Sequence, residues 1–240
     1  PDGAVRFVVD LQSHGSGTSF PGLASGDAEI GMASRPIKDS EEAELAAQGL
    51  TGMRSAEQQH VVALDGLLVL VSPENPVQAL PLETVARIFA GEITDWSEVG
   101  GRPGPISIHA RDDKSGTYDT FESLVLDPAG VALSPDAARY ESNALLSDTV
   151  ANDPNAIGFG GFAFLRNAKA LAVGSDCGIV SSPSTFAVKT EEYPLSRRLF
   201  LYTDAEMGAE ARGLLDFALS DAAQGAVLDV GFIDQGIDSL

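Results

Sequence analysis

The chain has 240 residues, with 35 Asp and Glu against 15 Lys and Arg, and therefore a formal charge of −20 at neutral pH. This length can bury a sizeable core in one compact unit or in two small lobes. The acidic balance argues against nucleic acid and anionic membrane surfaces as partners, because both need a basic face.

Targeting and metal-binding signals are scarce in the sequence. No apolar run reaches the roughly 18 residues of a membrane span. The sequence opens without a basic and apolar leader, so we expect any export signal to have been removed or to lie outside it. The three histidines show no ligand spacing, which predicts neither a metal site nor a cofactor. Cys177 is the single cysteine; it fits a small buried apolar residue in strand-like surroundings, or one partnered by a cysteine that precedes Pro1.

Strand and helix patterns alternate from the start of the chain. Residues 61–71 are nearly all apolar, as in a central strand buried on both faces. Pro81 suits the start of a helix and Gly91 its end. In chain order we predict a strand at 6–11, a helix at 20–24, a strand at 28–34, a helix at 39–49, a strand at 61–71, a helix at 81–91, a strand at 105–110, a helix from Ser115, a helix at 143–152, strands at 156–159 and 198–203, a helix at 205–219, and a last helix N-capped by Asp221 that ends before Gly231.

This alternation predicts an α/β fold with a largely parallel sheet. Ligands of such sheets bind beyond the carboxyl ends of strands, where the chain turns into a helix. Three of the predicted turns share a small, hydroxylic and glycine-containing character, namely 14–18, 33–36 and 111–117.

The third turn carries the strongest chemical signal. Ser115 and Thr117 begin a predicted helix, where hydroxyls and free backbone N–H groups favour negative charge. Glycine lets a ligand approach the backbone, and Arg111 can make a bidentate contact to an oxyanion. Plain alternatives exist for each residue: a turn, a helix cap, or an Arg111 partner at Asp112 or Asp113. The joint occurrence of three such turns favours a site for a small tetrahedral oxyanion.

Four passages resemble the periplasmic phosphate-binding proteins of ATP-driven uptake systems. They are Gly15-Ser16-Gly17 with residues 28–37, residues 88–96, residues 111–121 and, more weakly, residues 155–159. Residues 193–202 resemble a branch in which this domain is joined to an outer-membrane-protein-A-like, peptidoglycan-binding domain. The resemblance covers the whole chain and implies a type II periplasmic binding protein fold, with two lobes joined by a hinge and a mostly parallel sheet in each lobe.

The resemblance also implies a ligand set. The oxyanion ligands of the family fall on Ser16, Ser34, Arg111, Ser115, Gly116 and Thr117. Asp113 falls where the family has an acid that orients the arginine, and Gly15, Gly17 and Arg35 support the site.

Two departures from the family pattern bear on the ligand. Well-known members have an aspartate in place of Ser34, and an ionised carboxylate is the natural acceptor for the proton that phosphate keeps at neutral pH. Discrimination against sulfate is therefore expected to be weaker, with Arg35 as a source of compensating positive charge. Residues 1–11 match the second strand of the family, so the first strand–helix unit of lobe I is expected to be absent.

The resemblance assigns residues 1–73 and 190–240 to lobe I and residues 74–189 to lobe II, with hinge crossings near 71–76 and 185–193. The expected function is phosphate binding between the lobes for uptake by an ABC transporter, in an exported, monomeric protein of the periplasm or cell envelope. An envelope phosphate sensor or scaffold is the alternative. A serine hydrolase is disfavoured, because Lys114-Ser115-Gly116 stands without a Ser-x-x-Lys element.

Overall fold

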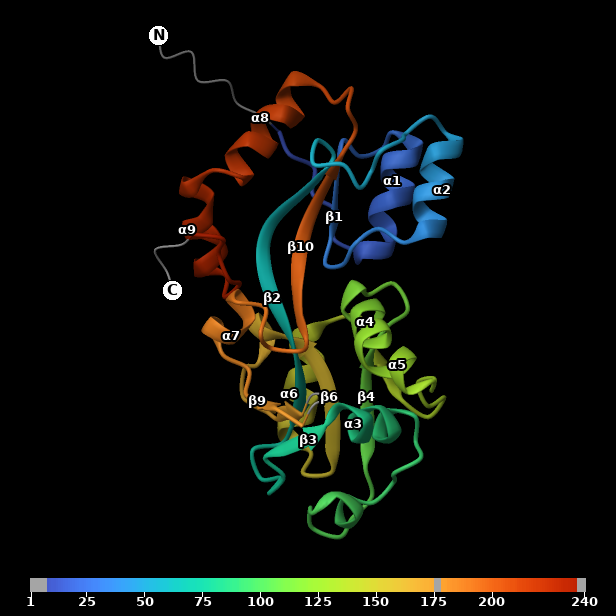
Figure 1. Cartoon of the computed structure of the whole chain (residues 1–240), viewed down its shortest axis with the longest axis vertical. Coiled ribbons are helices and arrows are strands. Elements are labelled where there is room, and N and C mark those ends of the chain that lie inside the picture. Colours follow the sequence, from blue (N-terminus) through green and yellow to red (C-terminus); the bar gives the residue numbers. More distant parts are fainter. Residues whose placement is uncertain (1–7, 175–177, 237–240) are drawn as a thin grey trace.

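The computed structural model describes residues 8–174 and 178–236. Figure 1 shows two bodies stacked along the long axis and joined by the long strands β2 (Gln59–Val71) and β10 (Ser196–Thr203). The body with α1, β1, α2, α8 and α9 is lobe I, and the body with α3 to α6 and β3 to β6 is lobe II. The two-lobed α/β fold predicted from the sequence is thus confirmed, while the exact lobe boundaries stay a prediction.

Two sheets organise the chain. The larger sheet has the strand order β1-β10-β2-β6-β4-β5, with β7 also paired to β2, and the smaller has the order β3-β8-β9. The remaining strands are β1 (Ile30–Ala33), β3 (Ala79–Pro81), β4 (Ser107–Arg111), β5 (Ala138–Tyr140), β6 (Ala156–Gly161), β7 (Lys169–Ala170), β8 (Ala172–Gly174) and β9 (Val180–Ser181).

The larger sheet is mixed rather than largely parallel. Within lobe II, β4 pairs in parallel with both β5 and β6. The strands β1, β10, β2 and β6 pair antiparallel in succession. β10 and β2 pair antiparallel because they carry the chain between the lobes in opposite directions. β2 changes partner from β10 to β6 between Gly66 and Leu67, before the crossing predicted at 71–76.

Helices cover these sheets at positions close to the predicted ones. Ser115 caps α4, and Pro81 stands directly before α3. The helices are α1 (Ser19–Ser25), α2 (Asp39–Ala47), α3 (Leu82–Phe89), α4 (Gly116–Phe121), α5 (Asp127–Ala129), α6 (Asn143–Asn152), α7 (Thr185–Lys189), α8 (Ala209–Ala218) and α9 (Asp221–Asp229), with 3-10 turns at Ser16–Thr18, Trp96–Val99 and Phe162–Phe164 and a π-helical turn at Glu122–Leu126.

Some local predictions were wrong. Residues 8–11 form no strand and lie exposed, since no described strand pairs with them; residues 1–7 lie outside the described residues. Ser220 rather than Asp221 is the N-cap of α9. The prediction for Cys177 also falls outside the described residues. Within them, no helix is both long and apolar enough to cross a bilayer.

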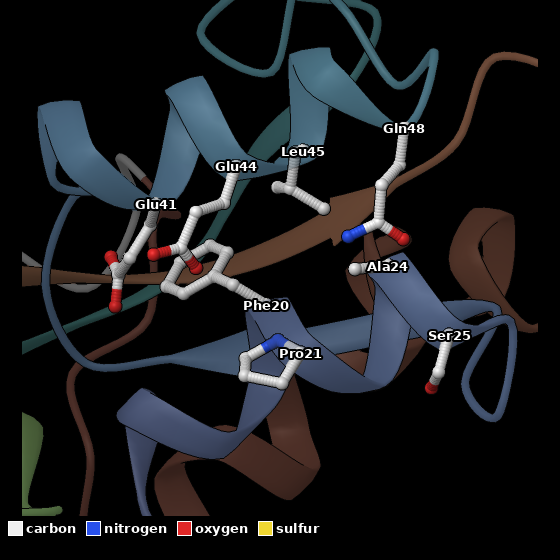
Figure 2. Close-up of a pocket in the computed structure, with 8 residues that line it drawn as sticks. All are labelled: Phe20, Pro21, Ala24, Ser25, Glu41, Glu44, Leu45 and Gln48. Carbon is white, nitrogen blue, oxygen red and sulfur yellow. The ribbon is translucent and has the colours of Figure 1, made fainter.

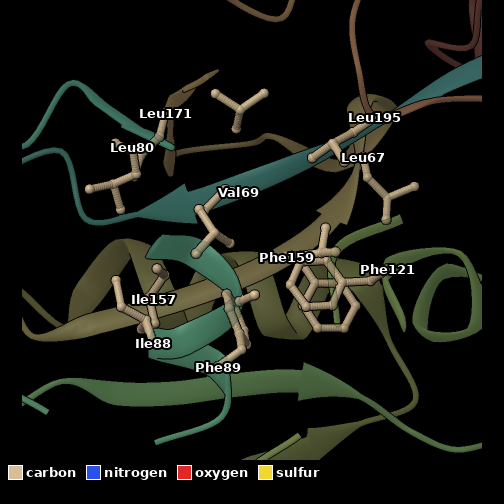
Figure 3. Close-up of a cluster of buried hydrophobic side chains, with 14 of the residues drawn as sticks. Leu67, Val69, Leu80, Ile88, Phe89, Phe121, Ile157, Phe159, Leu171 and Leu195 are labelled. Carbon is tan, nitrogen blue, oxygen red and sulfur yellow. The ribbon is translucent and has the colours of Figure 1, made fainter. Parts of the chain in front are cut away.

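The core of lobe II anchors α4 through Phe121, the last residue of this helix. Phe121 of α4 stacks on Phe159 of β6 with ring centroids 4.0 Å apart, and Phe89 of α3 meets both rings edge-on. All three rings are fully buried (Figure 3). Aromatic pairs of this kind contribute about 0.5–1.5 kcal/mol beyond their burial. The helix that follows the turn at Ser115 is therefore anchored to the centre of the sheet.

The smaller core of lobe I fixes the turn after β1. Phe20 of α1 packs edge-on against Tyr202 of β10 at 5.1 Å. The hydroxyl of Tyr202 accepts a hydrogen bond of 2.9 Å from the backbone N–H of Ile37. That contact holds residues 34–38 close to the strand that links the lobes.

Candidate functional site

The two serine turns predicted in lobe I lie side by side. Ser16 begins the 3-10 turn before α1, and Ser34 follows β1. Their hydroxyl oxygens are 3.2 Å apart, and the N–H of Ser34 donates to Ser16 Oγ at 2.9 Å. Gly15, at φ 100°, lies so close to the neighbouring turn that a Cβ there would be 2.4 Å from the carbonyl oxygen of Lys114. The N–H of Gly17 donates to the same carbonyl at 3.4 Å.

The third predicted turn meets these serines from lobe II. Ser115 Oγ accepts hydrogen bonds from the N–H groups of Thr117 and Tyr118, as a helix cap does. A Cβ on Gly116 would lie 2.1 Å from Ser16 Oγ and 2.5 Å from Ser34 Oγ, so the backbones meet where only glycine fits. The structure therefore brings the three turns together across the two lobes.

Arg111 brings a buried positive charge to this junction. It ends β4 and is 8% exposed. Its Nε and Nη2 donate to the carbonyl oxygens of Tyr140 and Glu141 at 3.1 and 2.6 Å, and no Asp or Glu of residues 8–174 or 178–236 forms an ion pair with it. Burial lowers the pKa of Arg111 below its ordinary value, Asp112 opposes this effect, and the charge of Arg197 adds to it. A negative ligand would offset both the cost of burying the charge of Arg111 and its repulsion from Arg197.

Asp113 has a different partner from the one expected. Its carboxylate is exposed and accepts a hydrogen bond of 2.5 Å from Nη2 of Arg139. The two backbone carbonyls of residues 140 and 141 orient Arg111 instead.

Arg35 also has a role other than the expected one. Its guanidinium contacts both carboxylate oxygens of Glu41 at 2.7 Å and Asp119 of α4 at 2.5 Å, and Lys38 contacts Asp119 at 2.6 Å. Burial acts to lower the pKa of Arg35, but the hydrogen bonds to Glu41 and Asp119 outweigh it and raise that pKa. Arg35 is therefore neutralised by two acids and ties lobe I to α4, rather than adding charge beside Ser34.

Arg197 is a site residue that the sequence reasoning missed. It lies in β10, is buried, and donates through Nη1 to Thr117 Oγ1 at 2.9 Å and to Ser34 Oγ at 3.4 Å. Its Nε and Nη2 donate to Asp65 Oδ2 at 3.0 and 2.6 Å. A signal was present, because side chains alternate between the faces of a strand. Of the adjacent pair Arg197 and Arg198, one must therefore face the interior.

Two surface pockets lie away from these residues. One of about 210 Å³ opens between α1 and α2 and is lined by Phe20, Pro21, Ala24, Ser25, Glu41, Glu44, Leu45 and Gln48 (Figure 2). Another, of about 470 Å³, lies between β2, α7 and β10 around Val61, Lys189 and Arg198. Neither collects the hydroxyls and guanidinium groups of the three turns. The site is identified by its chemistry, at a place where the two lobes are in contact.

The fold and this junction define a two-lobed binding protein whose lobes meet at a cluster of hydroxyls and buried guanidinium groups. Residues 4–222 match the PBP superfamily domain. The chain is 30% identical over 226 residues to the phosphate-binding protein PstS of Bacillus subtilis, covering 94% of this chain and 70% of that protein. It is 33% identical over 238 residues to protein SphX of Synechococcus elongatus, covering 94% of this chain and 68% of that protein. The chain belongs to the phosphate-binding protein family of the PBP superfamily.

Solved structures agree with this assignment. A putative phosphate ABC transporter substrate-binding protein from Clostridium perfringens, solved with bound phosphate, is 28% identical with a TM-score of 0.76, covering 92% of this chain and 85% of that one. An ABC-type phosphate transport receptor from Vibrio cholerae is 26% identical with a TM-score of 0.74, covering 95% of this chain and 88% of that one.

Proposed function

We propose that this chain binds inorganic phosphate between its lobes and presents it to an ABC transporter for uptake. The ligands would be Ser16, Ser34, Arg111, Ser115, Gly116 and Thr117. The observation that carries the proposal is Arg111, which is buried, pairs only with carbonyl oxygens among the described residues, and lies in the turn that meets the serines. Family membership supports the same conclusion.

The proposed mechanism is closure of the hinge around the anion. Ser16 and Ser34 belong to lobe I, and Arg111 with the turn 115–117 belongs to lobe II, so a bound anion would hold both lobes at once. Charged hydrogen bonds from a buried guanidinium are the strongest of these contacts. The Arg35–Asp119 ion pair beside the site would favour the same closed arrangement.

The setting of this function is inferred from the family. An exported protein of the periplasm or cell envelope, active as a monomer and delivering its ligand to a permease, fits a substrate-binding receptor. A sensor or scaffold in the envelope is the second candidate, favoured by the resemblance of residues 193–202 to the branch joined to a peptidoglycan-binding domain. A permease and an ATPase encoded beside the gene would favour uptake, and a peptidoglycan-binding domain in the full-length product would favour sensing.

Calorimetric titration with phosphate tests the proposal. Arg111→Gln should weaken binding by roughly 1.5–3 kcal/mol, the contribution of a charged hydrogen bond, which is about 10- to 150-fold in Kd. Arg102→Gln is the matched control, because it removes the same charge from an exposed loop. Absence of heat with phosphate would refute the binding function, and an unchanged Kd in Arg111→Gln would show that the site lies elsewhere.

A further inference from the structure

We propose that Arg197 is a positioning residue that turns the hydroxyls of Ser34 and Thr117 into donors toward the ligand, so that the site binds tetrahedral oxyanions through their unprotonated oxygens. This inference rests on the proposed function and concerns which oxyanions that site accepts. The residue lies where β10 passes between the lobes, within reach of hydroxyls from both.

A buried ion pair with Asp65 fixes the position of Arg197. Asp65 of β2 is fully buried, and its Oδ2 accepts both Nε and Nη2 of Arg197. Its Oδ1 accepts the N–H of Phe162 at 2.9 Å. A Cβ on Gly161 would lie 2.8 Å from Asp65 Oδ2 and 3.3 Å from Nη2 of Arg197, so the glycine leaves room for the pair. Contacts with β2 and the end of β6 thus hold the guanidinium of Arg197, on β10, at the place where the two lobes meet.

The direction of the hydrogen bonds follows from the chemistry of arginine. A guanidinium donates and never accepts. Since Nη1 lies 2.9 Å from Thr117 Oγ1 and 3.4 Å from Ser34 Oγ, both oxygens accept from it. Each hydroxyl proton then points away from Arg197, and the proton of Ser34 is turned to the ligand when Ser16 donates the 3.2 Å hydrogen bond that joins the two serines. The proton of the Ser115 hydroxyl is likewise available to a ligand, because the Ser115 oxygen accepts two backbone N–H groups.

Two acids that hydrogen-bond into the site, Asp65 and Asp119, are already engaged, while Asp112 and Glu141 act on the charge of Arg111. Asp65 uses both oxygens as described above, and Asp119 uses one oxygen for Arg35 and the other for Lys38. The junction therefore presents three hydroxyl protons and the Arg111 donors to a ligand. Such a site favours ligand oxygens that accept. A neutral hydroxyl that already accepts from Arg197 keeps one further lone pair, but it is a weaker acceptor than a carboxylate, so the proton that phosphate carries and sulfate lacks gains little. Sulfate is accordingly expected to bind within about tenfold of phosphate, or 1.4 kcal/mol.

The experiment neutralises the pair and compares the two anions at neutral pH by calorimetry. Asp65→Asn/Arg197→Gln replaces a buried ion pair by two amides of similar shape. Unlike arginine, the glutamine can accept as well as donate, which frees a hydroxyl to accept the phosphate proton. Sulfate should lose at least tenfold more affinity than phosphate. Glu191→Gln/Arg198→Gln is the matched control, since it neutralises an exposed pair with contacts of 2.7 and 2.9 Å at the next position of the same strand.

A second variant changes the shape of residue 197 but keeps its charge and its donor-only character. Arg197→Lys leaves Asp65 a charged partner and is also donor-only, so the ratio of sulfate to phosphate affinity should stay within about threefold of the wild-type ratio. This variant keeps the test available if the double variant does not fold, which thermal unfolding reports.

The outcomes separate the two proposals. Wild-type protein that binds phosphate but gives no heat with sulfate overturns this inference alone. The inference is also overturned if Asp65→Asn/Arg197→Gln leaves the ratio of sulfate to phosphate affinity unchanged, or if Arg197→Lys shifts that ratio. Wild-type protein that binds neither anion overturns the proposed function and this inference with it.

Discussion

Gly116 is the position where the smallest perturbation should separate binding from stability. It is the first residue of α4, and the two serines of lobe I lie directly over it. Its φ is compatible with an L side chain, so Gly116→Ala adds one methyl group without backbone strain. Alanine is favoured over glycine in helices by about 1 kcal/mol. The isolated lobe II should therefore tolerate the substitution.

The closed arrangement should not tolerate it. The added Cβ would be 2.1 Å from Ser16 Oγ, whereas real Cβ contacts lie beyond 3.0 Å, so the serine turn must retreat by at least 0.9 Å. A second contact of 2.5 Å to Ser34 Oγ prevents a sideways escape. Misplacing binding groups by about 1 Å costs on the order of 100-fold, which is about 2.7 kcal/mol.

Thermal unfolding with and without phosphate measures both effects. Without ligand, Gly116→Ala should lose no more stability than the contact between the lobes contributes, and it should show a much smaller rise in unfolding temperature when phosphate is added. Gly225→Ala in α9 is the control, because nothing lies within 4 Å of its added Cβ and ligand binding should not change. A phosphate affinity within threefold of wild type in Gly116→Ala would show that the serines do not meet this glycine in the bound protein.

Three further predictions concern stability. Asp119→Asn should lower the free energy of unfolding in urea by about 3 kcal/mol, because Arg35 is left buried with Glu41 alone, whereas Asp148→Asn at an exposed pair should cost less than 1 kcal/mol. Gly225→Ala should raise stability by about 0.5–1 kcal/mol, measured the same way, through the lower chain entropy of the unfolded state; a loss would show that α9 does not accept the methyl group. Burial lowers the pKa of His109, so the unfolded chain binds its proton more readily and stability should fall as pH drops below about 6.5. His109→Gln should flatten that pH profile, and an unchanged slope would contradict this assignment.

Local signals made the secondary structure and the three turns predictable. The apolar run 61–71 had to be a buried strand, and it forms the 13-residue strand β2. The hydroxyl of Ser115 had to cap the helix that follows it, whatever else it does. Each of these features depends on residues that are neighbours in the sequence.

The pairings between distant residues were not predictable in the same way. Arg35 faces Asp119 across 84 positions, and Arg197 faces Asp65 across 132. A turn that contains arginine predicts a positive charge, but whether that charge is free or neutralised depends on which acid the fold brings to it. For this reason the contact expected between Arg111 and Asp113 is not the one found, and Arg35 pairs with acids instead of adding charge beside Ser34, although both residues were expected near the junction.

The charge of −20 and a site for an anion are compatible because they act at different distances. Exposed acids act through water and salt with a screening length of about 8 Å, and of the acids at the junction, Asp65 and Asp119 are each paired with arginine. Arg111 keeps an unneutralised charge among the described residues in spite of the acidic exterior, because the chain presents carbonyl oxygens to it instead of carboxylates. The acidity of the surface therefore opposes the approach of a phosphate ion weakly, while the buried arginine decides whether it stays.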